Sequence, residues 1–241
     1  MLLSADTRPA KKQEAWQGIR DALPVIIGFI PFALVLGAQA SRKGLSVVEV
    51  PLMTALNFAG GSEFAAIELW TSPPHILLIV SMTFLVNSRH LLMGATLAPL
   101  LQHLPKRKAL FALFFMCDES WALGLSHARK RAEASSMPAF SLSYYAVVAG
   151  SLYLSWVVFT ATGAMLGPVL GDIETYGFDM AFPAVFLVLL KGMWQGKRTA
   201  IPWGVSLITA ALTSLFVPGA WYVLTGALSG LAVAYRGAGK S

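Results

Sequence analysis

Two glycines, a serine and a glutamate stand together inside an apolar stretch of this sequence, NFAGGSEFAAIELW. The residues of this stretch that could bind a charged ligand are Asn57, Gly60, Gly61, Ser62 and Glu63. The asparagine and both glycines are spaced i, i+3, i+4, so they share one helix face, where glycines let a backbone or a ligand approach closely. A helix that breaks at paired glycines also presents free N–H groups, which suit a carboxylate. The alternative is close helix packing, with Glu63 paired to a basic residue.

A second polar group follows in the sequence VNSRHLL. Arg89 offers a planar fork for a carboxylate, either that of a substrate or that of a side chain such as Glu63 or Asp118. Asn87 and His90 are three residues apart and can point together on a helix. His90 could carry protons near neutral pH, or it could be an ordinary hydrogen-bonded buried histidine.

Two adjacent carboxylates, Asp118 and Glu119, occupy a third apolar stretch. Neighbouring helical positions diverge by about 100°, so both cannot face one site. We expect Asp118 to face the core and Glu119 to cap a helix or pair elsewhere, and the reverse assignment is the alternative. Proton coupling is predicted for His90, Asp118 and Glu119. Because charges inside a bilayer are costly, Glu63, Arg89 and Asp118 are expected to meet in one pocket at membrane depth.

The composition places these residues in a membrane protein. The chain has 56% hydrophobic and 12% charged residues, and charged residues make up about 25% of a typical soluble domain. Its formal net charge is +6, and the lysines and arginines lie in short loops between the apolar runs, where they set membrane topology. We therefore expect no nucleic-acid partner. A single cysteine, Cys117, permits no intrachain disulfide. The first residues contain no apolar core of a signal peptide.

The apolar runs predict an all-α polytopic membrane protein with about eight hydrophobic segments: 22–40, 47–70, 75–101, 109–126, 139–167, 179–195, 199–216 and 219–236. Residues 1–21 are expected to form a cytoplasmic arm, 22–236 a single transmembrane domain and 237–241 a cytoplasmic tail. The basic residues of the loops place both termini in the cytoplasm.

Two arrangements of these segments remain open. Eight full crossings would leave two basic clusters, 42–43 and 106–108, on the outside, against the positive-inside rule. Re-entrant hairpins at 22–40 and 109–126 would place both clusters inside and leave six crossings. We favour eight segments, some of them interrupted.

Prolines and glycines mark the expected interruptions and hinges: Pro24, Gly28, Pro31 and Pro183. Proline inside a helix removes a backbone donor and bends the chain. The stretch 179–190 weakly echoes 21–36, and in the eight-segment arrangement the two would run in opposite directions. Inverted repeats with broken helices are typical of secondary transporters, although chance similarity between apolar helices is the alternative.

Five motifs in the same order resemble the AzlC family, the large subunit of bacterial branched-chain amino acid exporters, and within it the YgaZ-type valine exporters: PFALVLG (31–37), NFAGGSEF (57–64), NSRHLLMGATLAP (87–99), CDESWAL (117–123) and FPAVFLVLL (182–190). The resemblance covers about residues 17–236. It implies that the protein exports valine and related amino acids across the bacterial inner membrane, together with a small AzlD-type (YgaH-like) membrane subunit. One departure is Glu63, where the family usually has glutamine; a carboxylate there could bind a substrate ammonium, pair with Arg89 or carry a proton.

The leading hypothesis is therefore a proton-linked secondary transporter without a cofactor. The substrate-binding residues would be Asn57, Gly60, Gly61, Ser62, Glu63, Asn87, Arg89 and Asp118, with Phe29, Phe58 and Phe64 lining a valine-sized pocket. One alternative is an intramembrane hydrolase with Ser62 as nucleophile and His90 or His127 as base. Others are a scaffold for the partner subunit, or a metal-ion carrier using Glu63, His90 and Asp118. The chain has no Walker A motif, so it is not expected to be an enzyme that hydrolyses nucleotide by that route.

Overall fold

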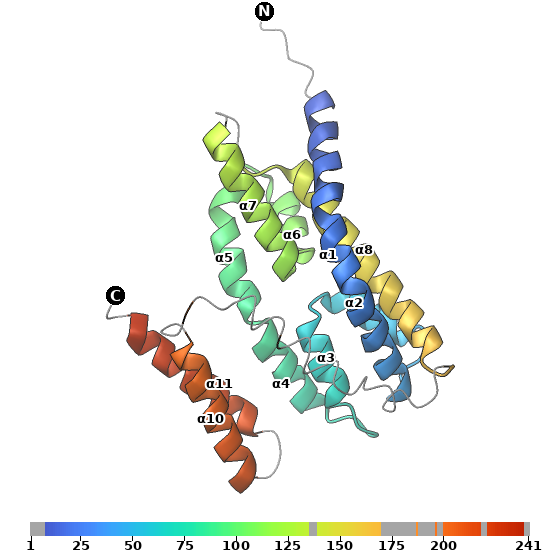
Figure 1. Ribbon diagram of the computed structural model, residues 1–241, viewed down its shortest axis with the longest axis vertical. Coiled ribbons are helices and arrows are strands. Elements are labelled where there is room, and N and C mark those ends of the chain that lie inside the picture. The colour runs from blue at the N-terminus through green and yellow to red at the C-terminus, as the bar shows by residue number, and fades with distance from the viewer. Residues whose placement is uncertain are drawn as a thin grey trace, which may run out of the picture. The chain divides into compact units, whose positions relative to one another are not determined.

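The structure is a computed structural model, and it describes residues 8–134, 139–169, 187, 196, 200–217 and 221–238. Every regular element among those residues is a helix, which confirms the predicted all-α class. The chain divides into two compact units, which we call unit 1 (Met1–Phe182) and unit 2 (Pro183–Ser241) and describe separately (Figure 1). The expected segment 179–195 and its Pro183 lie outside the described residues, apart from Leu187.

Unit 1 contains eight described helices: α1 (Arg8–Arg42), α2 (Glu49–Asn57), α3 (Gly61–Glu68), α4 (Ile76–Asn87), α5 (Arg89–Leu101), α6 (Lys106–Phe114), α7 (Asp118–Ala134) and α8 (Leu142–Leu166). Three stretches are long and apolar enough to cross a membrane: Lys12–Arg42 in α1, Ile76–Leu101 across α4 and α5, and Leu142–Leu166 in α8. At 1.5 Å per residue, even 25 helical residues exceed the roughly 30 Å of the hydrocarbon core.

Helix α1 is continuous, which corrects the interruption expected at 22–40 and argues against the alternative of a re-entrant hairpin there. It runs as one α-helix of 35 residues with Pro24 and Pro31 inside it, and it begins within the predicted arm 1–21. Each proline removes only its own N–H donor from the helical hydrogen bonds. The long contact with α8 supports α1 on both sides of each missing hydrogen bond. A hinge role for Pro24, Gly28 and Pro31 stays a prediction.

Helices α1 and α8 pack side by side and run parallel (Figure 1). Near their starts Ser141 donates to Glu14 and Tyr144 donates to Asp21, at 2.6 and 2.8 Å. Near their ends the contact is close because it is made by glycine. A Cβ atom at Gly163 would lie 2.1 Å from the carbonyl oxygen of Leu34. Such close contacts between small residues are a main source of helix association in membranes.

The predicted segment 47–70 folds as a hairpin of two short helices, α2 and α3, which we call the first hairpin. Helix α2 starts beside the later turns of α8, where Thr54 and Thr160 are hydrogen-bonded at 3.0 Å, and its end reaches the middle of α8, where Phe58 packs edge-on against Tyr153. Helix α3 then runs back toward the end of α1, where the carbonyl oxygen of Glu68 accepts a hydrogen bond from Lys43. The break expected at the paired glycines is confirmed.

The segment 109–126 forms a second hairpin, made of α6 and α7, which enters from the opposite end of α8. Tyr145, near the start of α8, donates to the carbonyl oxygen of Ala112, and Phe115 at the tip packs against Tyr153, with ring centres 4.8 Å apart. Helix α7 returns toward the start of α8, where the ring of His127 stacks on Tyr144. Both hairpin tips therefore meet at Tyr153, near the middle of α8.

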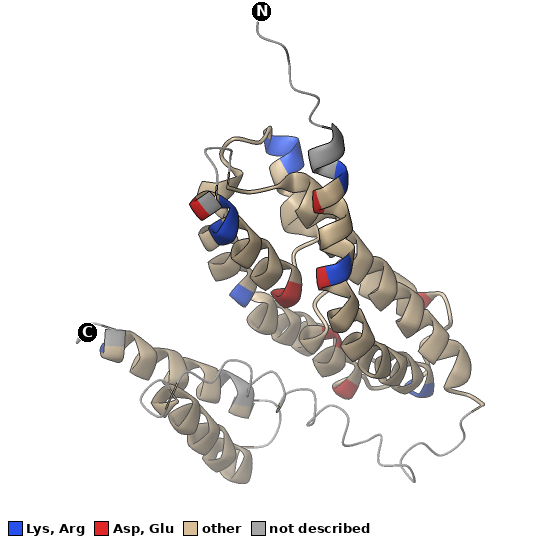
Figure 2. Cartoon of the chain, turned by 45° about the horizontal axis from the view of Figure 1, so that its top comes forward, with Lys and Arg blue, Asp and Glu red and all other residues tan. Residues whose placement is uncertain are grey.

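The outer surface of unit 1 is apolar along its long helices. Leu77, Phe84 and Leu92 on the α4–α5 run are 82%, 75% and 74% exposed, which suits contact with lipid. Helix α8 contains no charged residue and is tan along its length in Figure 2. The buried core between the second hairpin, α5 and α8 is also apolar and includes Leu97 and Tyr145.

Unit 2 contains two described helices, α10 (Ile201–Phe216) and α11 (Trp221–Ala238), which pack against each other. Gly226 and Gly230 face Ser206, and Thr225 donates to Thr213 at 2.9 Å. Residues 218–220, at the junction of the predicted segments 199–216 and 219–236, lie outside the described residues.

Candidate functional site

The tip of the first hairpin has an irregular backbone. Phe58 adopts the left-handed conformation with φ 44°, and Gly60 has φ 43°. Glycine adopts positive φ without strain, whereas phenylalanine pays of order 1–2 kcal/mol for it. The contact between Phe58 and Tyr153 of α8 holds this conformation. The break leaves both the N–H and the C=O of Ala59 outside helical hydrogen bonding, so both are available to side chains.

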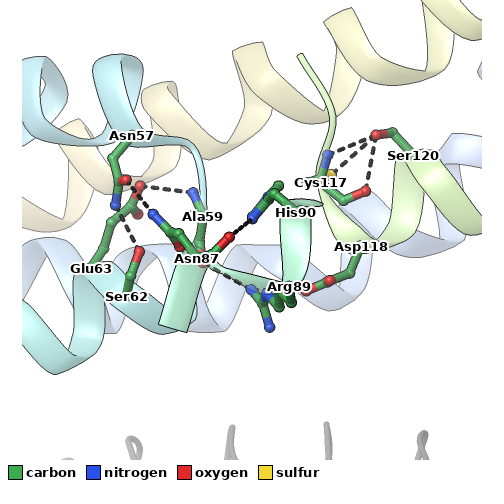
Figure 3. A network of polar contacts seen from close by, with 10 residues as sticks. All are labelled: Asn57, Ala59, Ser62, Glu63, Asn87, Arg89, His90, Cys117, Asp118 and Ser120. Atoms are coloured by element: carbon green, nitrogen blue, oxygen red, sulfur yellow. Dashed lines mark hydrogen bonds and ion pairs between the residues drawn. The ribbon is translucent and has the colours of Figure 1, made fainter. Parts of the chain in front are cut away.

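Arg89 joins the tips of the two hairpins (Figure 3). Its Nη2 donates to the carbonyl oxygen of Ala59 at 3.2 Å and lies 3.0 Å from Oδ2 of Asp118, the first residue of α7. Arg89 is near the middle of the 26-residue run Ile76–Leu101, so this ion pair lies about halfway along a stretch that is long and apolar enough to span a membrane. The side chains of Arg89 and Asp118 keep 31% and 33% of their exposure, which leaves the pair open on one face of unit 1.

A chain of amides lies beside this ion pair. Asn87 donates to Asn57 at 2.9 Å, and Asn57 donates to Oγ of Ser62 at 2.8 Å. Two buried atoms of this group have no hydrogen-bond partner: Oδ1 of Asn87, an acceptor, and Nε of Arg89, a donor. Buried polar groups are nearly always paired, so these two atoms are candidate contacts for a polar ligand.

Glu63 is completely buried and lies in the first turn of α3. Its Oε1 accepts from the N–H of Ala59 at 3.1 Å, and its Oε2 accepts from Nε1 of Trp156 at 2.7 Å. Ala59 thus bonds Glu63 through its N–H and Arg89 through its C=O. Of the two partners considered for Arg89, the structure selects Asp118 and not Glu63.

Helix α8 supplies three residues that the sequence analysis missed, Tyr153, Trp156 and Thr160. Tyr153 donates to the carbonyl oxygen of Ala55, and Trp156 holds Glu63 and packs edge-on against Phe29 of α1. Their spacing of i, i+3, i+7 places them on one helix face, and that pattern of polar and aromatic side chains was the available signal. The predicted lining residues Phe29 and Phe58 lie against this face.

The other predicted residues lie around the second tip and the α4–α5 junction. Asp118 pairs with Arg89 as expected, whereas Glu119 is half-buried in the same first turn of α7. His90 Nδ1 lies 3.2 Å from the carbonyl oxygen of Asn87. The substrate and proton roles assigned to all these residues stay predictions.

This geometry gives little support to the hydrolase and metal-ion carrier alternatives. Ser62 Oγ is bonded to Asn57 rather than to a histidine, and the ring of His127 stacks on Tyr144 instead. Within the described part of the chain, no group of three histidine, cysteine or carboxylate side chains could hold a metal ion.

Comparison with known proteins supports a family assignment. The family model described as AzlC protein matches residues 24–170, which include both hairpins and all three long apolar stretches except the first part of α1. The chain belongs to the AzlC family. Two AzlC relatives are the branched-chain amino acid transport protein AzlC of Bacillus subtilis, 26% identical over 86% of this chain and 81% of the relative, and the inner membrane protein YgaZ of Escherichia coli, 26% identical over 81% and 77%.

An uncharacterized membrane protein of Archaeoglobus fulgidus is 28% identical over 89% of this chain and 91% of its own length. A comparison with solved structures gives no match. The relatives are membrane proteins, and this AzlC chain has three stretches able to span a bilayer, so the predicted membrane location is confirmed.

Proposed function

We propose that this protein is a secondary transporter that exports branched-chain amino acids of the size of valine, together with a small AzlD-type membrane subunit and in exchange for protons. Membership of the AzlC family and the name of the Bacillus relative support the substrate class. The observation that carries the proposal is the Arg89–Asp118 pair, held between two hairpin tips about halfway along the α4–α5 run. Discontinuous helices at the membrane midplane are where secondary transporters bind their substrates.

The pair suits the head group of an α-amino acid. The substrate carboxylate would take the free Nε and the Nη2 of Arg89 as a bidentate partner, and the ammonium would take Asp118 and Oδ1 of Asn87. In the unloaded state the two charges neutralise each other, which avoids an isolated charge in the bilayer. The aromatic side chains beside Trp156 would contact the apolar side chain of the substrate.

The same geometry supports a membrane topology. The stretches in α1, α4–α5 and α8 would cross, and the hairpins would enter from opposite sides without crossing. With the N-terminus in the cytoplasm, the basic cluster 106–108 then lies inside as the positive-inside rule requires, and the cluster 42–43 lies outside. The hairpin of the six-crossing alternative is thereby placed at 47–70 instead of 22–40.

The two hairpins would act as opposing gates. The first closes the site from the side where α1 ends, and the second closes it from the side where α8 begins. Arg89 contacts both tips, so binding of the substrate carboxylate would compete with both contacts at once. Loosening one tip while the other stays closed would give alternating access.

The test is valine export from bacteria that lack their own exporters and are loaded with a valine-containing dipeptide. Cells that express this chain with an AzlD-type subunit should release valine faster than cells that carry an empty vector. Equal release, with the protein present in the membrane and co-purifying with the subunit, would contradict the transport proposal and favour the scaffold alternative.

Ser62→Ala separates transport from the hydrolase alternative. The variant loses the hydrogen bond from Asn57, which contributes about 1 kcal/mol to stability, but it loses no charge at the site. Part of this loss lowers the stability of the fold and only the rest affects transport. If the transport step loses about 0.6 kcal/mol, which is about RT, valine export should stay within about threefold of the wild-type rate. Complete loss of export in folded Ser62→Ala would support a nucleophilic role.

A further inference from the structure

The surroundings of Glu63 identify a site for a single proton. We propose that Glu63 is the proton-binding residue of this protein, and that protonation releases Trp156 and so unlocks the first hairpin from α8. The inference deepens the proposed function by assigning the coupling proton to one carboxyl group. From the sequence, proton coupling is predicted for His90, Asp118 and Glu119, and a proton at Glu63 is only one of three possible roles of that carboxylate.

The hydrogen bonds of Glu63 fit an ionised carboxylate. Both oxygens accept an N–H, one from Ala59 and one from Trp156. Neither N–H can rotate to become an acceptor, because the first is backbone and an indole nitrogen only donates. A proton on either oxygen turns that oxygen into a hydroxyl, which is a weaker acceptor than a carboxylate oxygen, so the hydrogen bond to that oxygen is weakened.

The charges around Glu63 leave its ionised form without a direct counter-ion in the described residues. Helix α8 has no charged residue, α4 has none, and α1 has none between Asp21 and Arg42. The charges on α2 and α3 themselves are Glu49, which is bonded to Ser46, and the exposed Glu68. Arg89 reaches Glu63 only through Ala59, and it is already paired with Asp118. A fully buried carboxylate with two donors and no cation gains substantially from taking up a proton.

Release of Trp156 has a direct structural consequence. Three hydrogen bonds tie the first hairpin to α8 in the described structure: Trp156 to Glu63, Tyr153 to Ala55, and the pair Thr54 and Thr160. The bond to Glu63 is the one that involves a charge, and such bonds are roughly twice as strong as neutral ones. In the proposed step a hydronium ion transfers a proton to Oε2 and leaves as water, so one O–H bond breaks as another forms. The N–H of Trp156 thereby loses its charged acceptor.

The coupling to substrate runs through Ala59. Arg89 holds the carbonyl oxygen of Ala59 and Glu63 holds its N–H, so the two ionic groups are separated by one peptide residue. When a substrate carboxylate draws Arg89 away, the tip of the first hairpin loses its bond to Arg89, and protonation of Glu63 removes the bond of the same hairpin to Trp156 of α8. The first hairpin is then free to move only when both events have occurred.

Infrared difference spectroscopy of the purified protein tests the proton site without transport. On acidification, wild type should show the carbonyl band of a carboxylic acid in apolar surroundings. Glu63→Gln should lack that band, and Glu68→Gln, a matched change at an exposed position of the same helix, should keep it. Persistence of the band in folded Glu63→Gln would overturn the proposal.

Tryptophan emission tests the release step. The change in emission between acid and alkaline pH should be present in wild type and in Glu68→Gln, and it should be absent in both Glu63→Gln and Trp156→Phe. An unchanged pH response in Trp156→Phe would show that Trp156 is not the group released. In liposomes, Glu63→Gln should accumulate valine against a proton gradient at a rate at least about tenfold lower than wild type, a loss of at least about 1.4 kcal/mol of coupling.

The outcomes separate the two proposals. A band that depends on Glu63 in a protein without valine flux would retain the proton site and refute the transport proposal. Normal flux whose proton dependence survives in Glu63→Gln would retain transport and refute the proton site.

Discussion

Replacing Arg89 by alanine is expected to reduce valine export to the level of cells without the protein. The variant removes a side chain that contacts both hairpin tips and is the proposed partner of the substrate carboxylate. Losing a charge-assisted bidentate contact costs of order 3–5 kcal/mol, which corresponds to a loss of at least about 100-fold in rate. Arg107→Ala is the matched control, because Arg107 is exposed at the start of α6, and it should export normally.

The partner variant Asp118→Asn should lose export to a similar extent, whereas its neighbour Glu119 provides a control. Glu119→Gln changes an adjacent carboxylate that does not pair with Arg89, so it should retain more export than Asp118→Asn. Export is measured from dipeptide-loaded cells, with protein level checked in isolated membranes. Wild-type flux in both Arg89→Ala and Asp118→Asn would remove the proposed site.

Exchanging the two charges separates a structural ion pair from a binding pair. The double variant Arg89→Asp with Asp118→Arg restores opposite charges across the 3.0 Å contact, so it should be more stable in detergent than either single variant. It should nevertheless fail to export, because the polarity of the site is reversed relative to Asn87 and the hairpin tips. Recovery of export in the double variant would indicate that the pair is only structural.

Gly163→Ala should destabilise the protein strongly, although it adds a single methyl group. That methyl would lie 2.1 Å from the carbonyl oxygen of Leu34, a backbone atom that cannot move without shifting α1. Overpacking typically costs 1–3 kcal/mol, and we expect about 3 kcal/mol here because the obstacle is backbone. Gly37→Ala on the facing helix should behave alike, since its methyl would lie 2.0 Å from the carbonyl oxygen of Thr160.

The matched control for this prediction is Gly150→Ala on the same helix. A Cβ at Gly150 meets no atom within 4 Å, so this variant should be at least as stable as wild type, given the better helix propensity of alanine. Thermal unfolding of the purified variants in detergent provides the measurement. Equal stability of Gly163→Ala and Gly150→Ala would contradict the tight contact between α1 and α8.

Much of the site could be predicted because charges are costly in lipid. Glu63, Arg89 and Asp118 stand out in apolar sequence, and the structure pairs Arg89 with Asp118 and links Glu63 to Arg89 only through Ala59. A shared pocket at membrane depth stays a prediction. The partner of Arg89 was not predictable, since two carboxylates were open to it. The backbone of Ala59 carries no signal of its own, because its role arises only from the break beside Gly60.

The position of the re-entrant hairpins was harder to predict. Prolines suggested a break in 22–40, but a helix supported by a long neighbour tolerates them, and α1 stays intact. The segment 47–70 is long enough to cross, and only Gly60 and Gly61 indicate that it folds back. Trp156 and Tyr153 were overlooked because aromatic residues are ordinary in an apolar helix and α8 has no charge to draw attention.

The central claim is that Arg89 and Asp118 recognise the two charges of an amino acid, and equilibrium binding to the purified protein tests it most directly. Radiolabelled valine should be displaced by unlabelled valine but at least about 100-fold less well by isovalerate, which lacks the ammonium group, or by isobutylamine, which lacks the carboxylate. In Asp118→Asn the preference for valine over isovalerate should fall, and in Arg89→Ala the preference over isobutylamine should fall. Equal displacement by all three compounds, or preferences unchanged in both variants, would contradict the account.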